Sequence, residues 1–420
     1  MNASPALHPV PRQLDIDSLE SFDSHAGASL GRPPGRSRGV MSGWHVQSVD
    51  LRGRAASLRG LDPAGAVFMG CSLPPGLEES LRSRGGLVFP ALPGIPFETR
   101  RAGLYTAGEL YAGIDEAEYE STPDARLYAW GHQLLGGAVG IGGGPGVLDA
   151  AQAVRLRGHA VEVEDNATDQ DLAVASALAA TLHDHAIGTA LDAALAGDLA
   201  GRRLVGVMGG HRAARGSAEY REAVLLGRGL AGAGYTVATG GGPGAMEAAN
   251  LGAYLAAATG GELEDALVTL AAASSYRPSV TAWARAAGEV LRRHPRGTAN
   301  LGIPTWFYGH EPPNLFATHI AKYFANAIRE AVLLAKCDGG IVFLPGAAGT
   351  VQEVFQDACE NYYGTPDTIR PMVLVGVEHW TTRLPAWPLL RALAAEREMA
   401  GSVHLVETEA EAVALLARLG

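Results

Sequence analysis

The fold of this chain is decided by one stretch, Gly340-Ile341-Val342-Phe343-Leu344-Pro345-Gly346-Ala347-Ala348-Gly349-Thr350-Val351-Gln352-Glu353. Its first four residues are apolar and β-prone, its middle is a glycine-rich turn, and the residues from 351 onward predict a helix. A turn between a strand and a helix directs backbone N–H groups and the positive helix end at an anion, most often a phosphate. Glu353 falls in the first turn of that helix, so a carboxylate stands beside the predicted anion site.

A second turn of the same kind lies upstream, at Gly240-Gly241-Gly242-Pro243-Gly244. Residues 235–239 predict a short strand before it, and residues 245–250 predict the start of a helix after it. Such turns are common in α/β proteins and can be tight connections without a ligand, so one loop alone is compatible with either interpretation. Two of them in one predicted sheet favour a phosphorylated ligand.

Beyond residue 200, predicted strands and helices alternate. This pattern is typical of an α/β fold, a Rossmann-like, doubly wound parallel sheet with helices on both faces. Ligands then bind at the carboxyl ends of the strands, where both glycine-rich turns fall. The pattern predicts strands at 204–208, 235–239, 266–270, 305–308, 340–344, 371–377 and 403–406, helices at 218–231, from 246, at 315–335, from 351, at 388–398 and at 410–419, and a polar connection at 273–300.

The chain is predicted to have three regions. Residues 1–40 are rich in Pro, Ser, Gly and Arg, which predicts a largely disordered tail. Residues 41–200 predict an additional N-terminal α/β domain of uncertain role, and residues 201–420 predict the Rossmann-like domain that carries both glycine-rich turns. The N-terminal domain is expected to hold strands at 66–70 and 86–89 and helices at 127–135, 169–182 and 187–195.

An internal echo lies within the N-terminal region. Residues 142–151 resemble residues 240–249 position by position, and the apolar residues 138–141 precede them like a strand. The echo is either a repeated turn type or a second, degenerate Rossmann-like lobe.

Composition excludes several classes of protein. The 420 residues are 47% hydrophobic and 18% charged, which is typical of a globular chain, and the net charge of −11 argues against a broad nucleic-acid-binding surface. Charged residues interrupt the apolar region 172–199, so it predicts buried helices and no membrane span. The three cysteines form no paired motif, and the N-terminus lacks the features of a signal peptide, so a cytoplasmic location is expected.

The stretch 345–353 resembles the P-G-G-x-G-T-x-x-E signature of the Lonely Guy (LOG) family. These phosphoribohydrolases split nucleoside 5′-monophosphates and were often mislabelled lysine decarboxylases. Residues 207–211, 239–247 and 311–314 narrow the resemblance to the long bacterial branch, the pyrimidine/purine nucleotide 5′-monophosphate nucleosidases. The similarity is strongest from about residue 200 to 380.

The resemblance implies a catalytic pair, Glu353 and Arg329. Arg329 lies one residue farther from the turn than the family pattern, and an extra residue at 339–340 would absorb the difference. Ala347 stands where the family usually has glycine, and alanine fits there only if no positive φ is needed. The predicted substrate- and phosphate-binding residues are Gly209, His211, Gly240, Gly241, Gly242, Gly244, Met246, Glu247, Gly346, Ala348, Gly349 and Thr350, with no metal and no cofactor.

The reaction implied is hydrolysis of an N-glycosidic bond to free base and ribose 5-phosphate, with an ionised Glu353 stabilising an oxocarbenium-like transition state. A non-catalytic nucleotide or molybdenum-cofactor carrier on the same fold is the alternative, and Ala347 favours it. The retained Glu353 and Arg329 favour the enzyme. A lysine decarboxylase is disfavoured because neither Lys322 nor Lys336 lies in a cofactor-like motif.

Each proposed site residue also has a plain structural interpretation. Glu353 can cap its helix, Arg329 can pair with Glu330, Met246 can belong to the core, and His211 can lie in solvent. Asn314 is expected to cap the helix predicted from residue 315. That helix carries more apolar residues than one buried stripe needs, which predicts a homodimer or a dimer of dimers.

Overall fold

The structure is a computed structural model that describes residues 14–31, 39–92, 95–134, 169–307 and 311–419. The described residues form two compact units, one of residues up to 103 together with 169–190, the other of residues from 104 to 134 together with 191–419. This division differs from the predicted boundary near residue 200, because residues 105–124 pack within the second unit. Tyr105, for example, forms an antiparallel bridge with Ile320.

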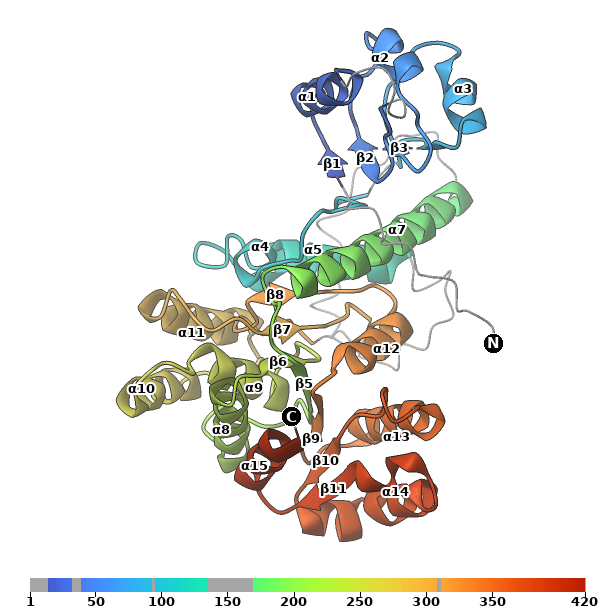
Figure 1. Ribbon diagram of the computed structural model, residues 1–420. Helices are drawn as coiled ribbons and strands as arrows, with labels where there is room; N and C mark the ends of the chain where they lie inside the picture. Colours follow the sequence, from blue (N-terminus) through green and yellow to red (C-terminus); the bar gives the residue numbers. More distant parts are fainter. Residues whose placement is uncertain (1–13, 32–38, 93–94, 135–168, 308–310, 420) are drawn as a thin grey trace. The chain divides into compact units, whose positions relative to one another are not determined.

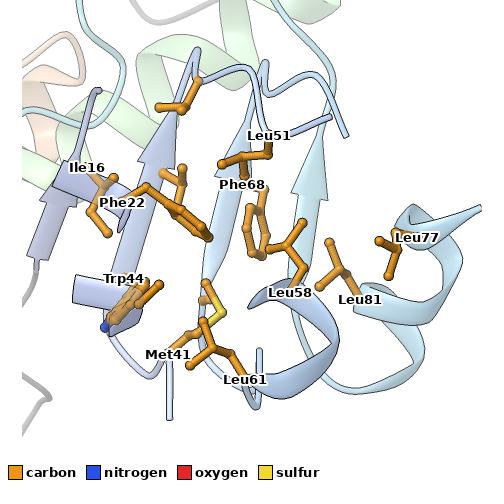
Figure 2. Packing of buried hydrophobic residues seen from close by; sticks show 14 residues of the cluster. Ile16, Phe22, Met41, Trp44, Leu51, Leu58, Leu61, Phe68, Leu77 and Leu81 are labelled. Atoms are coloured by element: carbon orange, nitrogen blue, oxygen red, sulfur yellow. The ribbon is translucent and has the colours of Figure 1, made fainter. Parts of the chain in front are cut away.

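The first unit is a four-stranded parallel sheet in the order β1-β2-β3-β4, accompanied by short helices (Figure 1). Apolar side chains from the strands and helices form one core beside it (Figure 2). The strands are β1 (Leu14–Ile16), β2 (Trp44–Gln47), β3 (Val67–Met69) and β4 (Leu87–Phe89), and the helices are α1 (Leu19–Leu30), α2 (Ala55–Gly60) and α3 (Leu77–Ser83).

Two predictions for this region need correction. Within the segment predicted to be a disordered tail, residues 14–30 form β1 and α1, because Ser18 caps the helix and Phe22 and Ala26 bury one face of it. The two helices predicted between 169 and 195 are one continuous helix, α7 (Asp169–Ala196). His183 and Asp184 do not interrupt it, since they are buried together with Nδ1 and Oδ1 3.2 Å apart.

The second unit is a seven-stranded parallel sheet in the order β11-β10-β9-β5-β6-β7-β8. The chain leaves β5 toward one edge and returns at β9 to build the other edge, an order that places helices on both faces of the sheet. This is the Rossmann-like α/β fold that was predicted. The strands are β5 (Leu204–Met208), β6 (Thr236–Thr239), β7 (Leu301–Gly302), β8 (His319–Ile320), β9 (Gly340–Phe343), β10 (Met372–Val375) and β11 (Val403–Val406).

The helices of this unit confirm most of the predicted positions. α8 and α9 follow β5 and β6, α13 follows β9, and α14 and α15 flank β11 (Figure 1). Their bounds are α4 (Ala107–Leu110), α5 (Pro123–Leu134), α8 (Ala218–Gly232), α9 (Ala245–Tyr254), α10 (Gly260–Ala271), α11 (Val280–Arg293), α12 (Asn326–Lys336), α13 (Ala348–Tyr363), α14 (Ala386–Ala394) and α15 (Glu409–Leu419), with short helical turns at Tyr119–Ser121, His379–Arg383 and Glu398–Gly401.

The segment between β6 and β9 was predicted least well. Residues 266–270 lie inside α10, which begins at a capping box of Thr259 and Glu262, and the expected polar connection 273–300 contains α11. Of the strand predicted at 305–308, the described residues 305–307 form only an isolated bridge, from Thr305 to Tyr323. The strands that the structure has in this segment, β7 and β8, are each two residues long, which is too short for hydrophobic periodicity to predict.

The helix predicted at 315–335 is also wrong, because the segment contains β8 and only then α12. Its apolar side chains Leu315, Phe316, Ile320 and Tyr323 are at most 6% exposed, so they belong to the core. These four residues therefore do not belong to the apolar helix face from which an oligomer interface was predicted.

Among the described residues, no helix is long and apolar enough to cross a membrane. The echo of the glycine-rich turn at 138–151 lies outside the described residues.

Candidate active site

The candidate site lies where β5, β6 and β9 end, at the point where the strand order reverses. The loops that follow β5 and β6 pack against each other, and the amide of Ala245 donates to the carbonyl oxygen of Gly210 at 3.1 Å. Gly244 has a φ of +73°, and a Cβ atom there would lie 2.5 Å from the carbonyl carbon of His211. Only glycine allows this close contact between the loops.

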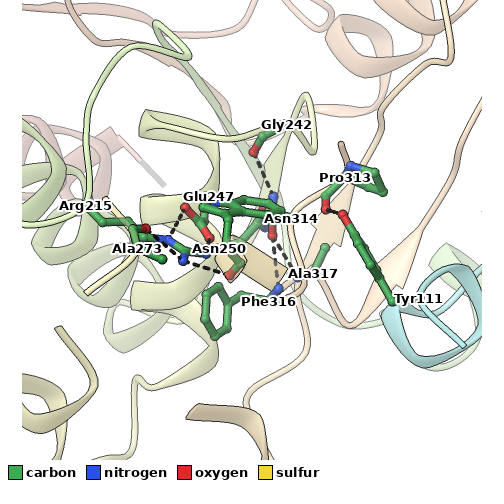
Figure 3. A network of polar contacts seen from close by, with 11 residues as sticks. Tyr111, Arg215, Gly242, Glu247, Asn250, Ala273, Pro313, Asn314, Phe316 and Ala317 are labelled. Carbon is green, nitrogen blue, oxygen red and sulfur yellow. Dashed lines mark hydrogen bonds and ion pairs between the residues drawn. The ribbon is translucent and has the colours of Figure 1, made fainter. Parts of the chain in front are cut away.

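A buried network of amide side chains holds the loop 240–244 in place (Figure 3). Asn314 donates from Nδ2 to the carbonyl of Gly242 at 3.2 Å and to Oδ1 of Asn250 at 2.9 Å, and its own amide donates to the carbonyl of Gly241 at 2.8 Å. Thr239 donates to the same Asn250 oxygen at 2.6 Å. Asn314 therefore fixes the loop, and it does not cap a helix beginning at 315 as predicted.

The structure brings Arg329 and Glu353 together. Arg329 extends from α12 and Glu353 from the first turn of α13, with Nη1 and Oε1 3.7 Å apart and side chains 8% and 17% exposed. A Cβ atom placed on Gly240 would lie 3.4 Å from Nη1 of Arg329, so the guanidinium also reaches the first glycine-rich loop. One cation thus stands between the first loop and the carboxylate.

The pKa of Glu353 is raised from its usual 4.5 to about 7. Burial is the largest cause, and the nearby carboxylates Glu330 and Glu311 add to it, while Arg329 acts in the opposite direction. Glu330 is itself held by Asn326 and Gln352, which donate to its two oxygens at 2.8 Å each. A carboxyl group with a pKa near 7 can exchange a proton at neutral pH, as acid–base chemistry requires.

Glu311 was not predicted as a site residue, although it lies in one of the segments that carry the family resemblance. Its Oε1 lies 3.0 Å from Nδ1 of His211, and this contact raises the pKa of the His211 imidazole. Its Oε2 lies 3.2 Å from where a Cβ atom on Gly242 would stand. A carboxylate and an exposed histidine therefore border the first loop, so this loop is a poorer place for a phosphate than the second.

The second loop, 345–350, leads into the N-terminus of α13. Ala347 has φ −124° and ψ −148°, an extended conformation open to any residue, and it is exposed. The replacement of glycine by alanine thus causes no backbone strain. No side chain caps α13, so the helix leaves the amides of Ala348, Gly349 and Thr350 without intrahelical partners.

Two residues of α9, Glu247 and Met246, were predicted to bind the substrate, and only Met246 lies beside a glycine-rich loop. Glu247 forms a buried ion pair with Arg215, in which both carboxylate oxygens accept hydrogen bonds from the guanidinium and each side chain is 1% exposed. The guanidinium also stacks over the ring of Trp283, with 4.6 Å between Cζ and the ring centroid. Glu247 is therefore corrected to a structural residue. Met246 is half-buried, and Cβ atoms placed on Gly240 and Gly242 would lie 2.8 and 2.9 Å from its Sδ and Cε, so it borders the first loop.

Two further predicted glycines, Gly209 and Gly346, are closely packed. A Cβ atom on Gly209 would lie 2.9 Å from that of Ala245, and one on Gly346 would lie 2.1 Å from Oγ1 of Thr350, which is buried. Of the two lysines, Lys322 is buried against Asp124 with Nζ 2.5 Å from Oδ1, and Lys336 pairs with Asp192 at 2.6 Å.

The chain matches no protein-family model, and no curated protein matches it. Two solved structures are similar to it in part. One is the molybdenum cofactor binding protein from the phototrophic bacterium Rippkaea orientalis, which is 16% identical over 52% of this chain and 98% of that chain, with a TM-score of 0.34. The other is the molybdenum cofactor carrier protein from Chlamydomonas reinhardtii, which is 19% identical over 52% of this chain and 98% of that chain, with a TM-score of 0.33. Likenesses this distant carry no functional conclusion, and the fold class rests on the strand order.

Proposed function

We propose that this protein is a nucleoside 5′-monophosphate phosphoribohydrolase, which hydrolyses the N-glycosidic bond to free base and ribose 5-phosphate. One observation carries the proposal. Glu353 and Arg329 face each other 3.7 Å apart between two glycine-rich loops, and the carboxyl has a pKa of about 7. A perturbed carboxyl beside a cation at the strand ends is the arrangement that a hydrolytic site needs.

In this proposal the substrate phosphate binds at the loop 345–350, where the uncapped helix α13 presents backbone donors and a positive dipole end. The ribose then lies over Glu353, and the base toward Met246 and Glu311. An ionised Glu353 stabilises the positive charge that develops on the ribose and orients the attacking water. Arg329 holds that carboxylate in place and keeps part of it ionised at neutral pH.

The test is incubation of the protein with a panel of nucleoside 5′-monophosphates and the matching nucleosides, with free base and ribose 5-phosphate measured. We expect base release from at least one monophosphate and slow release from its nucleoside. Glu353→Gln, which keeps the shape of the side chain, should lower turnover about 100-fold or more. Glu222→Gln on the exposed face of α8 is the matched control and should leave turnover unchanged.

Two outcomes contradict the proposal. Equal rates on nucleotide and nucleoside would remove the role of the loop 345–350. Tight nucleotide binding without base release would favour the alternative, a nucleotide or molybdenum-cofactor carrier that uses the same loops without catalysis.

The resemblance to the LOG family also supports a homodimer or a dimer of dimers. Exposed apolar residues of the second unit, Ile328 on α12 and Leu389 on α14, are 49% and 60% exposed. Light scattering at micromolar concentration tests this assembly, and a monomer with full activity would contradict it.

A further inference from the structure

His379 lies beside the loop 345–350, and neither the motifs nor the proposed chemistry has given it a role. β9 and β10 are adjacent parallel strands, so the loops that follow them meet at one edge of the sheet. Gly376, with a φ of +93°, turns the chain directly after β10, and a Cβ atom there would lie 3.4 Å from Cγ of Pro345. The helical turn that follows begins at His379 and directs its imidazole at the loop.

The contact between His379 and the loop is a hydrogen bond to the backbone. The amide of Gly346 donates to Nε2 of His379 at 3.3 Å. Because Nε2 accepts, the imidazole is neutral and its proton is on Nδ1. The histidine therefore occupies, in the free protein, one of the loop amides that a phosphate would use.

We propose that His379 is a phosphate-binding residue, which exchanges its hydrogen bond from Gly346 for a donated bond to the substrate phosphate and takes up one proton as the phosphate binds. This inference rests on the proposed function, because it places the phosphate at the loop 345–350. The proton comes from solvent and binds to Nε2, and it returns to solvent when ribose 5-phosphate leaves. No covalent bond changes in this step.

The charges around the ring favour the neutral form before binding and the charged form after it. Burial lowers the pKa of His379, and the Arg383 guanidinium in the same turn lowers it further, although Glu378 pairs with that arginine at 3.3 Å. The facing loop 345–350 carries no charged side chain. A phosphate dianion at the loop would be an opposite charge within hydrogen-bonding distance, which reverses this balance.

The test is calorimetric titration with ribose 5-phosphate at pH 7.5 in two buffers of different ionisation enthalpy, which gives the number of protons taken up. At this pH a phosphate monoester is almost entirely dianionic, because its second pKa is about 6. The wild-type protein should take up close to one proton more than His379→Asn, whose amide can accept from Gly346 but cannot be protonated. His379→Lys carries a permanent charge and should bind without extra uptake.

Kinetics give a second, independent reading. His379→Asn should raise KM for a nucleoside monophosphate by roughly ten- to a hundredfold, the loss expected for one charge-assisted hydrogen bond, and change kcat less. The matched control is His404→Asn on β11, since His404 is also half-buried with a pKa lowered by burial but lies outside the site. It should behave as wild type in both assays.

The outcomes separate this inference from the proposed function. A wild-type protein that releases base but takes up no more protons than His379→Asn would overturn the role of His379 and leave the nucleosidase standing. A wild-type protein that neither releases base nor binds ribose 5-phosphate would overturn both.

Discussion

Replacing Glu353 by glutamine should increase the stability of the protein while it removes activity. Raising the carboxyl pKa from 4.5 to about 7 means that ionised Glu353 destabilises the folded state. Each pKa unit corresponds to about 1.4 kcal/mol, so the destabilisation is about 3 kcal/mol before solvent is considered. The attraction to Arg329 is already contained in the pKa of about 7, and because the side chain is 17% exposed we expect a gain of about 1–3 kcal/mol.

The sign of the effect depends on pH. Below about pH 4.5 the carboxyl is protonated in both the folded and the unfolded chain, so glutamine changes nothing. Between about pH 4.5 and 7 the folded state holds the proton more tightly than the unfolded state, and the stability of the wild-type protein falls as pH rises. Above about pH 7 the full difference is present.

Urea unfolding of wild type and Glu353→Gln at pH 4.5 and pH 8 measures this difference. We expect the variant to gain stability at pH 8 only, with Glu222→Gln within about 0.5 kcal/mol of wild type at both pH values. In wild type, kcat/KM should rise with pH through about 7 as Glu353 ionises. A variant that is no more stable at pH 8, or equally stabilised at pH 4.5, would refute the assignment of a buried, costly charge to this position.

Three further changes have definite expected outcomes. Arg329→Ala should weaken nucleotide binding and turnover and move the rise of kcat/KM to higher pH, because Arg329 lowers the pKa of Glu353; an unchanged pH profile would place the catalytic cation elsewhere. Asn314→Leu should destabilise the protein by about 2–3 kcal/mol in urea unfolding and raise KM, since it removes the side-chain donor to the carbonyl of Gly242 in the loop 240–244, and wild-type values would contradict this role. Asp357→Asn should raise the melting temperature at pH 8 but not at pH 4, because burial holds the pKa of this carboxyl well above its usual range and its Oδ2 has no partner among the described residues. An equal shift at both pH values would show that packing, not charge, is responsible.

Local features of the chain were predictable from sequence because their causes are local. The turns after β6 and β9 follow from glycines placed between a β-prone run and a helical run. The position of Glu353 in the first turns of α13 follows from its spacing from the turn after β9. The alternation of strands and helices predicted the parallel sheet, since hydrophobic periodicity reflects the burial of each element. The sequence also posed the question whether alanine at 347 fits a position that is usually glycine. The extended backbone of Ala347 shows that it does.

The composition of the site depended on contacts that are distant in sequence. Asn314 and Gly242 are 72 residues apart, and Gly346 and His379 are 33 apart, so no local pattern reveals either pair. Glu247 has the sequence context of a ligand residue, yet Arg215 and Trp283 make it part of the core.

The same limit explains the misassigned segment from 315 to 325. Its apolar residues suit a helix or a buried strand equally well, and the neighbouring strand β7 selects the strand by hydrogen bonding to β8. By itself, the sequence determined the fold class, the two glycine-rich loops and the position of Glu353 in the helix that follows the second loop. Only the tertiary structure decided which side chains surround that carboxylate, and hence its pKa, because burial and charge at one point are set by residues that folding brings together.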